Sequence, residues 1–148
     1  MRNGEAYETE FRARAGAISS RIELPGPIPA SELDAFVGGL TALVLPYHLE
    51  LAGGASAMMM RAQEAGVPLV ISDTPNLRAL VDEANVTLVI PRNCELLASA
   101  IADVLANTER HEVRARNEQA RVHRENGHQA VGARVIEILR RVGADIAD

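Results

Sequence analysis

The sequence contains no lysine and no tryptophan, and each absence excludes a class of site. All 15 basic residues are arginine, so a Walker-type phosphate-binding loop, which needs a lysine, is excluded. A single cysteine, Cys94, excludes an intramolecular disulfide framework and a cysteine-rich zinc site. Two phenylalanines and two tyrosines are too few for a base-stacking platform, and the net charge of −5 argues against a nucleic-acid partner.

Long apolar runs are also lacking. No run approaches the ~20 residues of a membrane span. The polar start, MRNGEAYETE, is unlike a secretory signal. We therefore expect a cytoplasmic protein. The four histidines show no metal-ligand spacing, so no metal is expected. A chain of 148 residues that is 47% hydrophobic is long enough for one domain with a real core.

Short apolar runs alternate with amphipathic segments through the middle of the chain. The predicted strands are 21–24, 41–45, 69–72 and 86–90, and the predicted helices are 6–17, 31–38, 56–65, 76–83 and 93–107. Strand–helix–strand repetition indicates right-handed crossovers between parallel strands. The predicted fold class is α/β, a Rossmann-like parallel sheet with flanking helices.

The composition changes after Asn107. Charges of both signs are dense over 108–126, which is typical of an exposed helix with internal ion pairs, or of a partner-binding helix. Gly127 breaks that helix, and a last amphipathic helix follows. We treat 108–148 as a helical extension of a single partial domain that spans 1–148.

Three loops follow predicted strands, at 25–29, 46–56 and 73–76, where parallel sheets bind ligands. The second loop, PYHLELAGGAS, places small residues at the start of a helix, where free N–H groups can hold a phosphate. Simple helix capping by Ser56 is the alternative. His48 and Asp73 also follow strands. They either face a ligand or serve as a surface histidine and a turn residue.

The order of these features resembles a known family. The motifs are VLP at 44–46, GVPLV at 66–70, Asp73, VIP at 89–91 and the helix 94–107. Together they resemble, over about residues 20–142, the later part of the C-terminal domain of GT-B glycosyltransferases. The most similar group is the large retaining family 4.

The resemblance implies a glycosyltransferase-type domain that binds a nucleotide-activated sugar as substrate, without a cofactor, for transfer to an unknown acceptor. It implies contacts to the donor diphosphate from Gly53, Gly54, Ala55 and Ser56. Gly26, Pro27 and Ile28 match the loop that flanks the nucleobase, with a plain turn as the alternative. No residue is assigned a catalytic role.

The glutamate pair of the family is broken here. In such enzymes, two glutamates eight residues apart lie near the reacting sugar and the donor ribose. Counted back from Gly66, Gly53 and Arg61 replace them. Glu50 substitutes for the first only through a three-residue shift, which makes Met58 the partner.

The resemblance lacks the first strands of the family's domain and the acceptor-binding domain. We therefore expect no activity from this chain alone. The strand at 41–45 is expected to form an apolar sheet edge, which favours association with a missing domain, a partner chain or a second copy in a homodimer. The alternative function is a non-catalytic fragment or accessory subunit that completes another glycosyltransferase chain. A flavodoxin-like regulatory domain is a third, but no acidic phosphorylation cluster is present.

Overall fold

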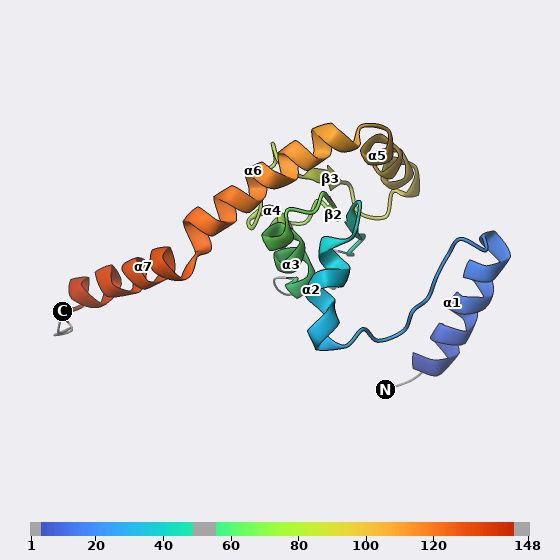
Figure 1. The fold of residues 1–148 in the computed structure, drawn as a ribbon, viewed down its shortest axis with the longest axis horizontal. Helices are drawn as coiled ribbons and strands as arrows, with labels where there is room; N and C mark the ends of the chain where they lie inside the picture. The colour runs from blue at the N-terminus through green and yellow to red at the C-terminus, as the bar shows by residue number, and fades with distance from the viewer. Residues whose placement is uncertain (1–3, 49–55, 144–148) are drawn as a thin grey trace. The chain divides into compact units, whose positions relative to one another are not determined.

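The computed structural model describes residues 4–48 and 56–143. These residues divide into two compact units, 1–33 and 34–148. The first unit contains α1 (Gly4–Ile18) and the beginning of α2 (Ala30–Gly38). The second unit contains the sheet and the remaining helices, so it holds the α/β fold (Figure 1).

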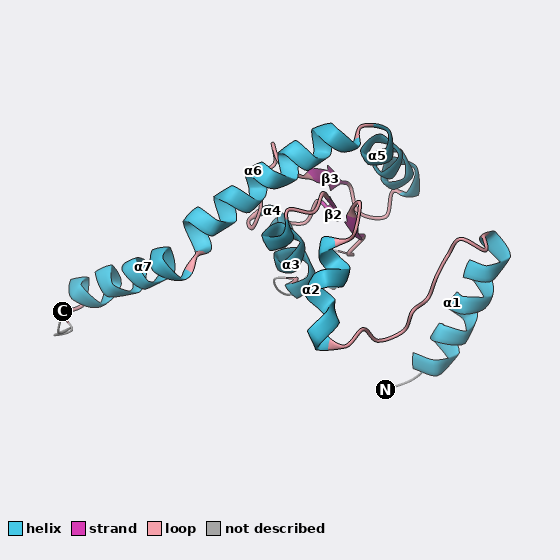
Figure 2. Cartoon of the chain, in the orientation of Figure 1, coloured by secondary structure: helices cyan, strands magenta, loops and turns pink. Residues whose placement is uncertain are grey.

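The sheet has three parallel strands in the order β1-β2-β3 (Figure 2). The strands are β1 (Leu43–Leu45), β2 (Leu69–Ser72) and β3 (Thr87–Val89). Every residue of the central strand β2 is buried, which explains its continuous apolar sequence. The predicted α/β class with a parallel sheet is confirmed.

Helices follow each strand. They are α3 (Ala57–Ala65), α4 (Pro75–Arg78), α5 (Cys94–Ala106), α6 (Thr108–Asn126) and α7 (His128–Arg141). The buried core cluster of Val70, Val89 and Val104 joins β2 and β3 to α5. Helix α6 lies along α3 (Figure 1). Gly66 ends α3 in the left-handed conformation, with a φ of 68°, which glycine adopts without steric cost.

A buried polar cluster fastens α6 to α3. The Glu118 carboxylate, 1% exposed, accepts hydrogen bonds from Gln63 Nε2 (2.8 Å), Arg121 Nη2 (2.7 Å) and the Asp82 backbone N–H (3.3 Å). Gln63 Nε2 and Arg121 Nη2 also donate to the Leu80 carbonyl, at 3.0 and 2.9 Å. Three distant segments therefore meet at one satisfied carboxylate.

The predicted helix 108–126 and its internal ion pairs are confirmed, for example Arg121 with Glu125 at 2.8 Å, but one face of the helix is buried at His111, Ala115 and Glu118. The predicted helix 76–83 is wrong in its extent, because α4 ends at Arg78. Beyond it, the carbonyl of Leu80 and the N–H of Asp82 bond to side chains of the polar cluster instead of extending the helix.

The predicted strand 21–24 is also wrong. Residues 22–26 have no strand assignment, and the described part of the first unit, 4–33, contains no strand with which they could pair. An isolated extended segment satisfies its backbone with water instead of a neighbouring strand. The prolines at 25, 27 and 29 exclude any helix there.

Candidate functional site

A cavity of about 230 Å³ lies where the carboxyl ends of all three strands meet the start of α5. Its lining residues come from the end of each strand and from the first turn of that helix: Pro46, His48, Ser72, Val89, Ile90, Arg92, Asn93, Cys94 and Leu97. Open parallel sheets bind their ligands at this edge. Most of the cavity wall is apolar, and its polar residues are His48, Ser72, Arg92 and Asn93.

Hydrogen bonds fix the ends of β2 and β3 beside this cavity. The Asp73 N–H donates to the Val89 carbonyl at 2.8 Å, which extends the β2–β3 pairing by one residue. The Thr74 hydroxyl, fully buried, accepts from the Leu77 N–H at 3.4 Å and caps α4. Ser72, the last residue of β2, lines the cavity at this edge.

The loop from β3 to α5 supplies the other side of the cavity. Asn93 caps α5 by accepting from the Leu96 N–H at 2.9 Å. Arg92, immediately before it, has a φ of 63°, in the left-handed region that residues other than glycine rarely adopt. No other described residue except glycine has a positive φ. This conformation turns the chain sharply from the strand into the helix.

The helix after β1 has a similar start. Ser56, 7% exposed, caps α3 by accepting from the Met59 N–H at 3.3 Å. The hydroxyls of Tyr47 and Ser56 lie 3.1 Å apart and share a hydrogen bond. Ser56 therefore caps α3, and its contact with a donor phosphate stays a prediction. The hydroxyl is thus oriented by two protein contacts at the end of β1.

The structure describes only some of the other predicted donor contacts. Glu50, Gly53, Gly54 and Ala55 lie outside the described residues. His48 lines the cavity at the end of β1. The turn Gly26, Pro27 and Ile28 belongs to the first unit, where Gly26 has a φ of 77°.

Asp73 occupies the end of β2, but it is held by an arginine. Arg78 donates to both carboxylate oxygens of Asp73, at 2.7 and 2.6 Å. The hydrogen bond from Arg78 lowers the pKa of the Asp73 carboxyl. Arg78 also donates to Glu83, so one guanidinium spans the whole of α4 and the turn after it. Asp73 therefore forms a structural ion pair with Arg78, and its contact with a donor stays a prediction.

Arg61, which replaces the second glutamate of the family's pair, does not line this cavity. Its guanidinium pairs with Asp34 of α2. Arg61 and Asp34 line a separate hollow with Glu64 and Ala65. This hollow shares no residue with the cavity at the carboxyl ends of the three strands, which we call the carboxyl-edge cavity. Arg61 is therefore a partly exposed residue of α3, with a side chain 40% exposed, in a surface ion pair with Asp34.

Sequence reasoning missed part of the cavity. The sequence patterns do not single out Ser72, Arg92 or Asn93, and Cys94 is used only to exclude a disulfide framework and a zinc site. A signal for them existed, because residues 90–93 follow a strand and precede a helix like the loops that were recognised.

Comparison with known proteins decides the family. The model of the family described as glycosyl transferases group 1 matches residues 3–107. The chain belongs to this family. The resemblance to GT-B glycosyltransferases is thereby confirmed.

Solved structures agree on the fold. This group 1 chain superposes on a sucrose-phosphate synthase from Thermosynechococcus elongatus with a TM-score of 0.79 at 20% identity, covering 95% of this chain and 35% of that one. It also superposes on the C-terminal domain of a glycosyl transferase group 1 family protein (LpcC) from Francisella tularensis. There the TM-score is 0.68 at 17% identity, over 83% of this chain and 63% of that one. The chain thus spans about a third of the synthase. No curated protein matches it.

Among residues 4–48 and 56–143, no helix is both long and apolar enough to span a bilayer. In the same part of the chain, no group of three or more His, Cys, Asp or Glu side chains is arranged to hold a metal.

Proposed function

We propose that this chain is the donor-binding part of a glycosyltransferase, which holds a nucleotide-activated sugar at the carboxyl edge of its sheet. The single observation that supports this most strongly is the cavity at the ends of β1, β2 and β3. It occupies the edge where parallel sheets of this kind bind nucleotides, in a chain that belongs to the group 1 glycosyl transferases. The reaction proposed is glycosyl transfer to an acceptor held by another domain or chain.

The start of α3 is the proposed contact for the donor diphosphate. Its first-turn N–H groups have no partners within the helix, and the dipole favours a negative charge there. Ser56 begins this turn with its hydroxyl fixed by Tyr47 and Met59. The contacts from Gly53, Gly54 and Ala55, and those from Gly26, Pro27, Ile28, Glu50 and Asp73, stay predictions. No metal is needed if a helix N-terminus neutralises part of the diphosphate charge.

Thermal melting with UDP-, GDP- and ADP-sugars tests this function. A ligand present at 100 times its dissociation constant stabilises a folded protein by about 2.7 kcal/mol. For a chain of this size, that corresponds to a rise in Tm of roughly 5–10 °C. We expect one nucleotide sugar to produce such a rise and the corresponding free sugar to produce none. If none of the nucleotide sugars raises the Tm, donor binding is contradicted.

Two variants of Ser56 separate binding from folding. Ser56→Ala removes both the cap and the hydroxyl, and lowers stability by about 1 kcal/mol without ligand. Ser56→Asn keeps a capping oxygen. We expect both variants to show a smaller ligand-induced rise in Tm than the wild type. A rise as large as that of the wild type in both would exclude a donor contact at Ser56.

A non-catalytic accessory subunit is the second candidate, and the Arg61–Asp34 ion pair favours it. The position of the ribose-binding glutamate carries an opposite charge, and that charge is bound to Asp34 outside the carboxyl-edge cavity. Such a subunit would complete another glycosyltransferase chain, with the edge strand β1 as its contact. If Arg61→Glu gains affinity for a nucleotide sugar that the wild type does not bind, this second candidate is favoured.

A further inference from the structure

We infer that His111 is the acid-sensitive part of a latch between α6 and β3. The neutral imidazole holds Arg114 against the turn before β3, and the protonated imidazole releases it. His111 is a titratable group that is only 4% exposed, and the proposed function does not use it. The inference goes beyond donor binding and does not depend on it.

Both nitrogens of the His111 ring have partners. Nε2 lies 2.8 Å from Asp103 Oδ2 of α5, and Nδ1 lies 3.3 Å from Arg114 Nη1 of α6. Because a carboxylate accepts and a guanidinium donates, one neutral tautomer fits, in which Nε2–H donates to Asp103 and Nδ1 accepts from Arg114. The other tautomer would place an N–H against the guanidinium and a lone pair against the carboxylate.

Asp103 fixes the Nε2 side of the ring. It also accepts from Arg110 Nη2 at 2.6 Å and from Asn107 Nδ2 at 2.8 Å. The hydrogen bond from His111 and the charge of Arg110 hold the pKa of the Asp103 carboxyl below its ordinary value of 3.8. The charged groups that contact the ring are Asp103, Arg110 and Arg114. Between pH 8 and pH 5, the imidazole is therefore the group of this cluster that changes its charge.

Arg114 connects this ring to the sheet. Its Nε donates to the Ala84 carbonyl at 2.8 Å, its Nη2 donates to the Val86 carbonyl, and its Nη1 lies 3.5 Å from the Thr87 hydroxyl. We call these three contacts the Arg114 latch. Thr87 is the first residue of β3, a strand of three residues that pairs with β2. One guanidinium therefore holds the start of a short strand against α6.

A proton on Nδ1 is incompatible with this arrangement. It converts the acceptor for Arg114 Nη1 into a second donor and places a positive ring 3.3 Å from a positive guanidinium. One carboxylate, Asp103, would then face three cations. Arg114 is the group that leaves, because water can replace the neutral oxygens of the latch, whereas His111 is buried in the helix packing.

Release of Arg114 is expected to loosen β3. The turn before the strand loses its contacts to α6, and the strand keeps only its pairing with β2 and its packing on α5. Val89, the last residue of β3, lines the carboxyl-edge cavity. Acidification is therefore expected to weaken the order of one wall of that cavity.

Ring NMR and hydrogen exchange on the full chain test the latch. The imidazole ¹⁵N shifts report the tautomer and protonation of His111, and exchange rates corrected for their intrinsic pH dependence report the protection of the β3 amides. We expect the Nε2–H tautomer at pH 7.5. As the pH is lowered to 5, protection of β3 is expected to fall about tenfold with the same midpoint as the protonation of His111. A histidine with only a packing role would not produce a shared midpoint.

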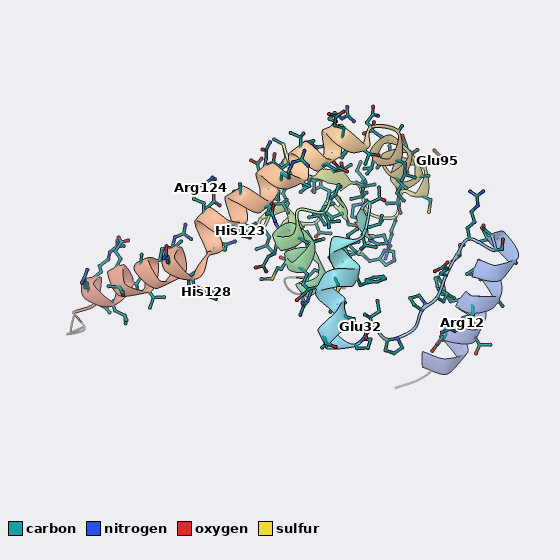
Figure 3. All side chains as sticks on the ribbon, in the orientation of Figure 1. Arg12, Glu32, Glu95, His123, Arg124 and His128 are labelled. Atoms are coloured by element: carbon teal, nitrogen blue, oxygen red, sulfur yellow. The ribbon has the colours of Figure 1, made fainter. Side chains whose placement is uncertain are left out.

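Three variants separate the latch from a general loss of stability. His111→Gln keeps an amide donor and acceptor but does not titrate, so protection of β3 should no longer change between pH 7.5 and pH 5. Arg114→Gln removes the latch and should lower this protection about tenfold at pH 7.5, with little further change at pH 5. His123→Gln is the matched control, because His123 is exposed near the other end of α6 (Figure 3), and it should keep the wild-type pH dependence.

Several results overturn the inference. They are a ring that is already protonated at pH 7.5 while β3 is protected, a ring that is still neutral at pH 5, and protonation of His111 without loss of protection. A loss of protection with the same midpoint in His111→Gln also overturns it, and this outcome can be scored even if His111→Gln is less stable. Donor binding is measured separately at pH 7.5, so failure of the latch leaves the proposed function standing.

Discussion

Gln63 and Glu118, 55 residues apart in the sequence, meet in a buried hydrogen bond of 2.8 Å between Nε2 and Oε1. The bond joins α3, which begins at the carboxyl edge, to α6, which lies outside the sheet. The same carboxylate accepts from Asp82 and Arg121. This buried acid therefore helps to hold α3, and with it the proposed diphosphate contact, in place.

Removing this acid is expected to destabilise the fold strongly. Glu118→Ala leaves Gln63, Arg121 and the Asp82 N–H without their common acceptor. Breaking a buried charge network of this kind costs about 3–5 kcal/mol. Glu112→Ala, an exposed position on the same helix with a 3.7 Å ion pair to Arg116, is the control and should change stability by about 0.5 kcal/mol or less. Urea unfolding measures both, and equal effects would show that Glu118 has no special structural role.

The same residue predicts a pH dependence. Burial alone raises the pKa of Glu118, but the hydrogen bonds from Arg121, Gln63 and the Asp82 N–H outweigh it, so the pKa lies below the ordinary value of 4.5. A lowered folded pKa contributes stability above pH 4.5, and this contribution is lost as the pH falls through the folded pKa.

The comparison uses Glu118→Gln, which does not titrate. The difference in unfolding free energy between the wild type and Glu118→Gln is expected to be constant near pH 7. It should shrink progressively as the pH falls below about 4.5. Denaturant unfolding at a series of pH values measures it, and a difference independent of pH would contradict the ionised state of Glu118.

The left-handed conformation of Arg92 predicts a stabilising substitution. Arg92→Gly removes the steric cost of a φ of 63°, at the expense of greater backbone freedom in the unfolded chain. We expect the unfolding free energy to rise by roughly 0.5–1 kcal/mol. A destabilised Arg92→Gly would contradict the strained conformation.

Two glycines near the C-terminal helix are expected to behave in opposite ways. A Cβ on Gly127 would overlap the His123 carbonyl oxygen at the bend between α6 and α7, whereas a Cβ on Gly132 has no atom within 4 Å (Figure 1). Gly127→Ala should therefore lower the amide protection of α7. Gly132→Ala should raise it, because alanine is favoured over glycine in a helix by about 0.5–1 kcal/mol. Hydrogen exchange measures both, and the same direction in both variants would contradict the bend.

Features of the fold whose sequence signals lie within a few neighbouring residues could be predicted, and features that depend on distant contacts could not. The strands at 69–72 and 86–90, the helix at 93–107 and the cap at Ser56 have their signals within a few residues, and they were predicted with small boundary errors. The burial of Glu118 was not predicted, because its partners Asp82 and Gln63 lie 36 and 55 residues away in the sequence. Arg92 carries no sequence signal for a positive φ, since arginine is not a residue that favours it. The expected strand at 21–24 was wrong because alternation alone provides no pairing partner.

Amide chemical-shift mapping of the ¹⁵N-labelled chain tests donor binding at the carboxyl edge most directly. The chain is titrated with UDP-, GDP- and ADP-sugars, a method that detects weak binding and locates it. We predict that one of these ligands shifts amides at the strand ends and at the start of α3, namely His48, Ser56, Ser72–Thr74 and Ile90. Amides at the opposite edge, such as Thr41 and Val67, should not move. Shifts confined to that opposite edge, or no shifts with any nucleotide sugar, would contradict the account.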